Sequence, residues 1–143
     1  MIVDTSALLA ILFDEPDAES YARALAGADT TRLSAGNFVE TAIVVEAQTH
    51  ASGRGQFDTL IRRAGIVIEP FTEEQTQIAR QAYTDFGKGR HPAGLNFGDC
   101  FAYALAKTTA EPLLFKGEDF SKTDITAVLS FPQNAPAHST RQA

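Results

Sequence analysis

The sequence predicts an α/β fold in which a mostly parallel central sheet carries helices on both faces. Short apolar or β-branched runs alternate along the chain with longer segments of helical composition, and this alternation is typical of parallel sheets. Glycine, proline or helix-capping residues separate the two kinds of segment. The chain has 143 residues, of which 44% are hydrophobic, and this matches the size and composition of one compact domain.

Five short segments are expected to be strands because they are apolar, often β-branched, and bounded by turn residues. The first four should form the sheet and the fifth is compatible with it, which predicts four to five strands. In chain order they are Ile2–Val3, Thr31–Leu33, Ile66–Ile68, Leu113–Phe115 and Ile125–Leu129.

Helices are predicted over residues 7–12, 16–27, 36–50, 56–63, 72–86 and 98–109. Pro16 and Gly27 are suited to the start and end of the second helix, and Thr72 followed by Gln75 fits a capping box at the start of the fifth. The helix at residues 36–50 has apolar residues on most faces, which predicts that it is well buried. Three glycines and one proline make residues 87–97 a loop.

The composition also limits the class of protein. The first residues lack the basic region and long apolar run of a secretory signal, and no uncharged apolar stretch approaches the roughly 20 residues of a membrane-spanning helix. Cys100 is the only cysteine, which excludes an internal disulfide. We therefore expect a cytoplasmic protein with one domain at residues 1–130. Residues 131–143 are mostly polar and contain proline, and we expect them to form a disordered tail.

The net charge of −6 argues against a nucleic-acid partner, because proteins that bind polyanions usually carry a basic surface. The distribution of charge weakens this argument. Residues 1–50 account for the whole net charge, and the rest of the chain is neutral in sum, with its basic side chains grouped at residues 54–63 and 88–122. This pattern is compatible with a local positive surface, and also with an ordinary solvated one.

Acidic residues map to the carboxyl edge of the predicted sheet, where ligand sites of open parallel sheets lie. Asp4 ends the first strand, and Glu40 lies in the first turns of the helix that leaves the second strand. The helix that begins near Asp99 must finish at the opposite edge to enter the fourth strand, so Asp99 starts from the carboxyl edge. Glu118 and Asp119 directly follow that fourth strand.

Position along the helix separates Glu40 from Glu46. Glu46 lies six residues further on, roughly 9 Å down the helix axis and away from the edge. Glu46 is therefore the weaker candidate.

Each acid of this cluster also has a purely structural explanation, as a helix cap or a turn residue. Against that explanation, Asp99 has Phe97, Cys100 and Phe101 as neighbours and Asp4 follows a buried strand, so neither has the setting of a surface charge. Converging carboxylates repel one another unless a hard divalent cation such as Mg²⁺ or Mn²⁺ neutralises them. The sequence thus predicts a divalent metal site at this edge.

Other catalytic signatures are missing from the sequence. It contains no Gly-x-Gly-x-x-Gly after the first strand, no Walker A motif and no Cys/His spacing for zinc. Nothing identifies the nucleophile of a catalytic triad, although Ser6 beside Asp4 leaves that alternative formally open.

Four parts of the chain together resemble the PIN-domain nucleases, and within them the VapC toxins of bacterial toxin–antitoxin pairs. The resemblance reaches to about Leu129 and is carried by residues 2–8 (IVDTSAL), Glu40 in its helix, residues 95–100 (LNFGDC) and residues 113–120 (LLFKGEDF). It implies a PIN-like three-layer α/β/α sandwich and a Mg²⁺-dependent endoribonuclease that hydrolyses RNA phosphodiester bonds, with Mn²⁺ as a possible substitute. It further implies inhibition by a VapB-type antitoxin, a homodimer and a toxin–antitoxin hetero-oligomer.

The resemblance also implies roles for the acidic residues. Asp4 and Asp99 would be the principal metal ligands, Glu40 would contribute directly or through water, and Asp119 would complete the catalytic quartet. Many members of the family carry an acid or amide near the position of Gly117, which this chain lacks, so Glu118 stays an alternative to Asp119.

Further polar residues are additional candidates. Thr5 or Ser6 would position a phosphate or a water molecule, and is equally suited to capping the following helix. Four basic side chains are candidates for contacts with RNA phosphates, with a solvated loop as the alternative: Lys88, Arg90, His91 and Lys116.

Two other functions fit parts of the pattern. An N-terminal strand ending in Asp and a late Gly-Glu-Asp are also found in haloacid-dehalogenase-type phosphohydrolases, but those enzymes usually need a second Asp at the position of Ser6. In a non-catalytic reading, the acids are structural and the domain only binds a partner.

Overall fold

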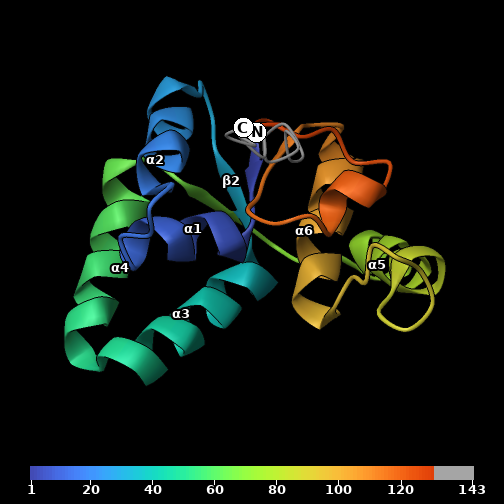
Figure 1. Ribbon diagram of the computed structural model, residues 1–143, viewed down its shortest axis with the longest axis horizontal. Coiled ribbons are helices and arrows are strands. Elements are labelled where there is room, and N and C mark those ends of the chain that lie inside the picture. Colours follow the sequence, from blue (N-terminus) through green and yellow to red (C-terminus); the bar gives the residue numbers. More distant parts are fainter. Residues whose placement is uncertain (131–143) are drawn as a thin grey trace, which may run out of the picture.

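Four parallel strands form a central sheet between two groups of helices in the computed structural model, which describes residues 1–130 (Figure 1). The strands are β1 (Ile2–Val3), β2 (Arg32–Ser34), β3 (Val67–Glu69) and β4 (Leu113–Leu114), in the order β3-β2-β1-β4. Each neighbouring pair is parallel, so the predicted α/β class with a parallel sheet is confirmed. The tail predicted at residues 131–143 lies outside the described residues.

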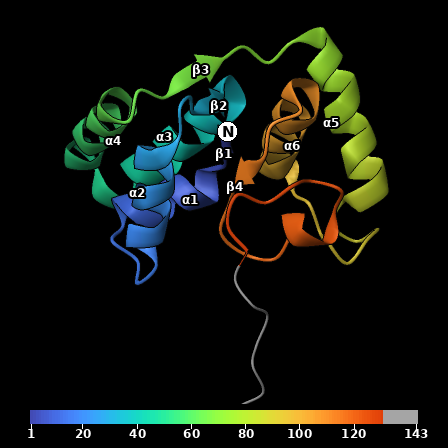
Figure 2. The ribbon, with the colours of Figure 1, turned by 90° about the horizontal axis from the view of Figure 1, so that it is seen from above.

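The helices divide between the two sides of the sheet. Figure 2 shows α1 to α4 on one side and α5 and α6 on the other. Their bounds are α1 (Thr5–Leu12), α2 (Ala18–Gly27), α3 (Ala35–Thr49), α4 (Ala51–Arg63), α5 (Glu73–Phe86) and α6 (Phe97–Thr109), followed by the 3₁₀ turn η1 (Phe120–Lys122). No helix within residues 1–130 is long and apolar enough to cross a membrane, and the expected cytoplasmic location stays a prediction.

Alternation along the strands gives the sheet two apolar faces. Ile2 pairs with Leu113 and packs in the core formed with α6, whereas the next residues, Val3 and Leu114, pair with each other and pack in the core formed with α1 and α2. All four side chains are fully buried. Successive side chains of a strand point to opposite faces, so strands of only two residues are enough to anchor both helical layers.

The fifth strand predicted at residues 125–129 is not formed, so the sheet has four strands. Within this segment only Ala127 makes an isolated parallel bridge, to Leu113. Leu113 donates its backbone N–H to Thr126 and accepts one from Val128, which satisfies both of its polar groups. Because β4 is only two residues long, it offers too short a template for pairing to continue.

The prediction that the helix at residues 36–50 is well buried is wrong for α3. Its apolar residues Val39 and Ile43 are 54% and 63% exposed, whereas the polar residues Asn37 and Thr41 are completely buried. The amide nitrogen of Asn37 donates to α6 and the hydroxyl of Thr41 donates to α1, which offsets part of the penalty for burying them, although Asn37 Oδ1 has no partner among the described residues. The inner face of α3 is therefore partly polar, and it faces the carboxyl edge of the sheet.

Candidate active site

Asp4 follows β1 and caps the helix that leaves it. Its Oδ2 accepts hydrogen bonds from the backbone N–H of Ser6 (3.0 Å) and from the Ser6 hydroxyl (2.6 Å). Its Oδ1 is buried and has no hydrogen-bond partner among the described residues. Burial raises the pKa of Asp4 to about 6, although the hydrogen bonds from Ser6 act in the opposite direction. One oxygen of this carboxylate is thus structural and the other is free.

Asp99 lies in the first turn of α6 and forms a capping box with Asn96. Its Oδ2 accepts from the backbone N–H of Asn96 (3.0 Å), and its own N–H donates to the Asn96 side chain (2.9 Å). Burial, followed by the charge of Asp4, raises the pKa of Asp99 to about 7. The capping role considered from the sequence is confirmed, yet it occupies only one carboxylate oxygen.

The acids that influence the pKa values of Asp4 and Asp99 show which carboxylates are neighbours. The charge of Glu40 raises the pKa of Asp4, and the charges of Asp4, Asp119 and Glu40 raise that of Asp99. These four carboxylates therefore lie at one edge of the sheet. Asp119 is exposed at the start of η1 and makes no side-chain capping bond.

The two weaker candidates have no such influence. Neither Glu118 nor Glu46 is among the charges that raise the pKa of Asp4 or Asp99. Glu46 instead lines a small cavity between α3 and α4. The geometry thus favours Asp119 over Glu118 and Glu40 over Glu46 as members of the cluster.

Glu40 is held where α3 and α6 approach each other most closely. The side-chain amide of Asn37 donates to Glu40 Oε1 (3.3 Å) and to the backbone carbonyl of Gly98 (2.9 Å). A Cβ atom at Gly98 would lie 1.8 Å from Glu40 Oε2, so only glycine leaves room for this carboxylate. The same approach is repeated at Gly36, where a Cβ atom would lie 2.4 Å from the ring of Phe101.

The sequence analysis did not predict a role for Asn37 or Gly98 at the site, although the position of each residue in its helix indicates one. Asn37 precedes Glu40 by three residues, which places the two side chains on one face of a helix. Gly98 is a helix-breaking residue within the first turn of α6, directly before Asp99. A glycine at such a position indicates a close approach by another group, here the Glu40 carboxylate.

Thr5 and Ser6 connect elements rather than face an open site. Thr5 is buried; its hydroxyl donates to the backbone carbonyl of Asn37 (3.3 Å) and accepts from Thr41 (3.1 Å), which ties α1 to α3. Besides donating to Asp4, the Ser6 hydroxyl accepts from the backbone N–H of Lys116 (2.9 Å), which ties β1 to the segment after β4. These contacts support structural roles, and contact with a phosphate stays a prediction for both.

The four basic residues predicted to contact RNA differ in the partners that they have among the described residues. The ammonium of Lys116 contacts Glu15 and lies 2.9 Å from Asp17 Oδ1. The guanidinium of Arg90 lies 5.8 Å from the centre of the Tyr83 ring. His91 accepts from the backbone N–H of Ala93 through Nδ1, whereas the side chain of Lys88 is exposed without an ion pair in residues 1–130.

The carboxylate cluster has the chemistry of a divalent-cation site. Residues 1–130 contain no group of three or more Asp, Glu, His or Cys side chains that could hold a metal ion as they stand. Mutual repulsion and the capping bond of Asp99 both keep these side chains apart in the absence of a counter-charge. The buried, unpartnered Oδ1 of Asp4 is nevertheless a fitting ligand for a hard cation, and Asp99 and Glu40 are the nearest further donors.

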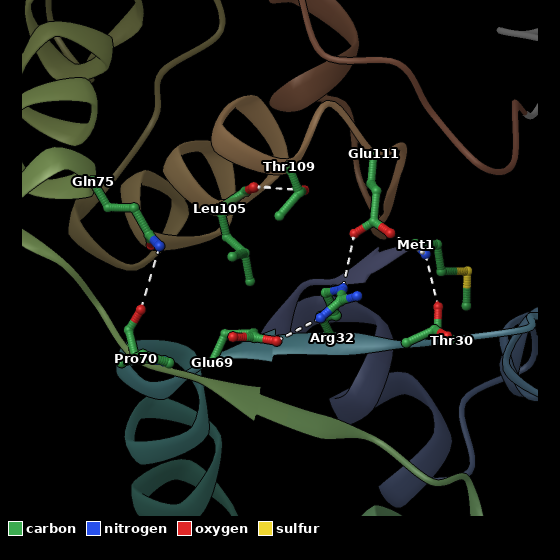
Figure 3. Close-up of polar contacts among 9 residues, drawn as sticks. All are labelled: Met1, Thr30, Arg32, Glu69, Pro70, Gln75, Leu105, Thr109 and Glu111. Carbon is green, nitrogen blue, oxygen red and sulfur yellow. Dashed lines mark hydrogen bonds and ion pairs between the residues drawn. The ribbon is translucent and has the colours of Figure 1, made fainter.

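Charges around Arg32, which begins β2, are paired. Figure 3 shows Arg32 between Glu69 and Glu111, with distances of 2.6 Å and 3.4 Å. The N-terminal ammonium of Met1 lies 3.7 Å from Glu111 and donates to the carbonyl of Thr30 (2.8 Å). The hydrogen bond to Glu69 raises the pKa of Arg32 further. These charges are therefore neutralised by the chain's own groups.

Comparison with known proteins agrees with this geometry. The PIN domain model matches residues 1–125. Among similar sequences, Ribonuclease VapC28 of Mycobacterium tuberculosis is 55% identical over 130 residues, which are 90% of this chain and 98% of that protein. Ribonuclease VapC of Mycolicibacterium smegmatis is 49% identical over 128 residues, which are 90% and 99% of the two chains.

Solved structures support the fold. The crystal structure of Mycobacterium tuberculosis VapC20, described as a toxin that cleaves the sarcin–ricin loop, superimposes with a TM-score of 0.73 at 17% identity, covering 89% of this chain and 97% of that one. A toxin–antitoxin complex from Klebsiella pneumoniae gives a TM-score of 0.63 at 15% identity over 86% and 92% of the two chains. The chain belongs to the PIN-domain family and, within it, to the VapC ribonucleases of toxin–antitoxin systems.

Proposed function

We propose that Asp4, Glu40, Asp99 and Asp119 are the catalytic residues of a Mg²⁺-dependent endoribonuclease, with Asp4 and Asp99 as the principal metal ligands. The observation that carries this proposal is the buried Asp4 carboxylate, whose Oδ1 has no hydrogen-bond partner among the described residues although the charges of Glu40 and Asp99 are close enough to interact with it. No lysine or arginine of residues 1–130 is ion-paired with any of the four. A cluster of this kind requires an external positive charge.

The chain's own residues supply position and charge for phosphodiester hydrolysis. A divalent cation held by these carboxylates would lower the pKa of an attacking water molecule and stabilise the leaving oxygen. Ser6 fixes the orientation of Asp4, Asn96 fixes that of Asp99, and Asn37 fixes that of Glu40. Mn²⁺ would substitute for Mg²⁺, because both are hard cations that prefer oxygen ligands.

The partners follow from the family. The relatives are ribonucleases, and one structural neighbour is a toxin–antitoxin complex, which supports an RNA substrate and a VapB-type antitoxin that inhibits the enzyme. A homodimer and a toxin–antitoxin hetero-oligomer are part of the same proposal. Lys88, Arg90 and His91 are the preferred candidates for RNA contacts, since the ammonium of Lys116 is already bound by two carboxylates.

The test is RNA cleavage by purified, antitoxin-free protein with Mg²⁺ or Mn²⁺. Asp4→Asn and Asp99→Asn should abolish cleavage without unfolding the domain, because an asparagine oxygen can accept the same capping hydrogen bonds. Two matched pairs sharpen the assignment. Glu40→Gln and Asp119→Asn should lower the rate, whereas Glu46→Gln and Glu118→Gln should not. Full activity of Asp4→Asn and Asp99→Asn with circular dichroism unchanged would contradict the proposed site.

Two other functions were compatible with the sequence. Membership of the PIN-domain family sets aside the haloacid-dehalogenase-type alternative, and the hydroxyl of Ser6, at the position of the missing Asp, is hydrogen-bonded to Asp4. Turnover of small phosphomonoesters without RNA cleavage would be needed to restore it. Absence of metal-dependent cleavage of total cellular RNA, with the protein folded and free of antitoxin, would instead support a domain that only binds a partner.

A further inference from the structure

An aromatic cavity lies beside the carboxylate cluster, between α5 and α6. It has a volume of about 540 Å³, and its lining includes the rings of Phe71, Tyr83, Phe97 and Phe101. Phe97 is the most exposed of the large apolar residues described, at 80%, and Tyr83 is 41% exposed. Exposed aromatic surface of this kind marks a binding site more often than an ordinary surface position.

The rings form one connected group whose outer member is free. Phe71 and Phe101 are half-buried and meet edge to face, with ring centres 4.6 Å apart, and Phe97 meets Phe101 in the same way at 5.0 Å. Phe101 is fixed further by its contact with the backbone at Gly36. Phe97 is therefore held at its base by packed rings, while most of its surface has no protein partner in residues 1–130.

The first turn of α6 links this cavity to the carboxylates. Asn96 lines the cavity, and its backbone N–H donates to the Asp99 carboxylate (3.0 Å). Phe97 and Asp99 are two residues apart and project from roughly opposite sides of the turn, so they are separated by about the 10–12 Å diameter of a helix. A short stretch of single-stranded RNA spans this separation. A nucleotide close to the cleaved bond can therefore reach the cavity.

The charges around the cavity suit a polyanion. Arg80 and Lys88 belong to its lining, and both are exposed. Neither is ion-paired within residues 1–130, and no Asp or Glu lines the cavity. By comparison, Lys116 is bound by Glu15 and Asp17. Cations without an ion pair, next to exposed aromatic rings on which bases can stack, are features with which proteins bind unpaired nucleic-acid strands.

We propose that this cavity is a subsite for one unpaired nucleobase of the RNA substrate, which stacks on Phe97 while Arg80 and Lys88 contact neighbouring phosphates. This inference rests on the proposed nuclease function, and it places part of the substrate specificity in α5 and α6 rather than in the carboxylates. The enzyme should therefore require an unpaired base at a fixed distance from the cleaved bond.

The direct test is binding without cleavage in an Asp99→Asn background. Fluorescence anisotropy would measure the affinity for a fluorescein-labelled single-stranded RNA that spans a cleavage site mapped with the wild-type enzyme. Phe97→Ala should weaken binding by about 5-fold to 100-fold, the range expected for the loss of one stacked base. Phe97→Tyr should restore most of the affinity. Val39→Ala, at an exposed apolar position of α3, is the matched control and should change nothing.

Substitution in the RNA identifies the stacked base. Replacing the nucleotides one at a time by an abasic residue should produce one position at which affinity falls as far as in Phe97→Ala, with no further loss when both changes are combined. Arg80→Gln and Lys88→Gln should each reduce the slope of log affinity against log salt by about 0.7, the value for one phosphate of a single strand. Lys116→Gln should leave the slope unchanged.

The outcomes separate this inference from the function on which it rests. If the wild-type protein cleaves RNA but Phe97→Ala binds it as tightly as the control, the subsite is wrong and the nuclease assignment stands. If Phe97→Ala converts a dimer to a monomer in light scattering and no abasic position matters, the cavity is a protein–protein contact. If the wild-type protein cleaves no RNA with Mg²⁺ or Mn²⁺, the proposed function itself fails.

Discussion

Two groups of carboxylates in this protein differ in whether they are paired with a cation. Arg32, at the amino end of β2, lies between Glu111, which precedes β4, and Glu69, the last residue of β3, and the N-terminal ammonium adds a second cation beside Glu111 (Figure 3). At the carboxyl edge, Asp4 and Asp99 have no cationic partner within residues 1–130, and their pKa values are raised to about 6 and about 7. Carboxylates therefore form ion pairs around Arg32, whereas at the carboxyl edge they lie without a cationic partner among residues 1–130.

This difference shows how structure and function share the acidic residues. Asp4 and Asp99 each use one carboxylate oxygen for the fold, because Asp4 caps α1 and Asp99 caps α6. The remaining oxygens are left without a partner, as Asp4 Oδ1 shows. Capping fixes the Asp4 and Asp99 side chains in place, and the lack of a counter-charge among residues 1–130 is consistent with the proposed cation site. The structural and catalytic explanations of these acids are thus complementary.

Gly98→Ala should have the largest effect on RNA cleavage, because Gly98 leaves the space that the Glu40 carboxylate occupies. A methyl group 1.8 Å from Glu40 Oε2 must displace Glu40 or push α3 away from α6. Because the Glu40 carboxylate is the end of a flexible side chain that can move aside, we expect little change in the free energy of unfolding, whereas RNA cleavage should fall about 100-fold. Urea denaturation and initial cleavage rates measure the two effects.

Gly55→Ala is the matched control for this substitution. Gly55 lies within α4, where an added Cβ atom meets nothing within 4 Å. Alanine should therefore stabilise the helix by about 0.5–1 kcal/mol and leave cleavage unchanged. Wild-type cleavage by Gly98→Ala would show that Glu40 does not need its observed position.

Arg32→Met tests whether the ion pairs around Arg32 serve stability alone. Its loss leaves Glu69 and Glu111 without their shared cation, and we expect the free energy of unfolding to fall only slightly, because these side chains are 27–35% exposed and water screens exposed ion pairs. Cleavage per folded molecule should stay at the wild-type level, since none of these residues belongs to the carboxylate cluster. If Arg32→Met lost cleavage under conditions in which it is fully folded, Arg32 would also contribute to the function of the distant carboxylate cluster.

The pH dependence of stability should show the cost of burying charged carboxylates at the carboxyl edge, to which their mutual repulsion adds. Because the pKa values of Asp4 and Asp99 are raised from 3.8, the folded chain binds more protons than the unfolded chain between these values. Their contribution to stability is complete below pH 3.8 and is lost as pH rises through about 6 and 7. The metal-free protein should therefore gain about 1–2 kcal/mol between pH 8 and pH 6.

Asp99→Asn isolates this contribution. The variant should be more stable than wild type at pH 8 in the presence of EDTA, and its stability should change less between pH 8 and pH 6. Mg²⁺ should stabilise the wild type at pH 8 more than the variant, because binding to the folded state adds to its stability. Parallel pH profiles of the two proteins in thermal denaturation would contradict the raised pKa of Asp99.

Local sequence patterns were enough to predict the α/β class and the parallel sheet, and they also predicted a group of acidic residues at the carboxyl edge. These features depend on local patterns: short apolar runs, helix caps, and the position of Asp4 and Asp99 directly after or before elements whose direction is fixed. The choice of Glu40 over Glu46 also followed from the rise of a helix; the charge of Glu40 raises the pKa values of Asp4 and Asp99, and its catalytic role stays a prediction.

Which polar side chains are buried and which apolar side chains are exposed depends on tertiary contacts. Burial of Asn37 and Thr41 depends on hydrogen-bond partners in α1 and α6, far away in the sequence, so apolar composition alone wrongly placed all of α3 in the core. Exposure of Phe97, and the space that Gly98 leaves for Glu40, likewise depend on how α6 packs against its neighbours. Such contacts are set by the assembly of distant segments, which local patterns do not encode.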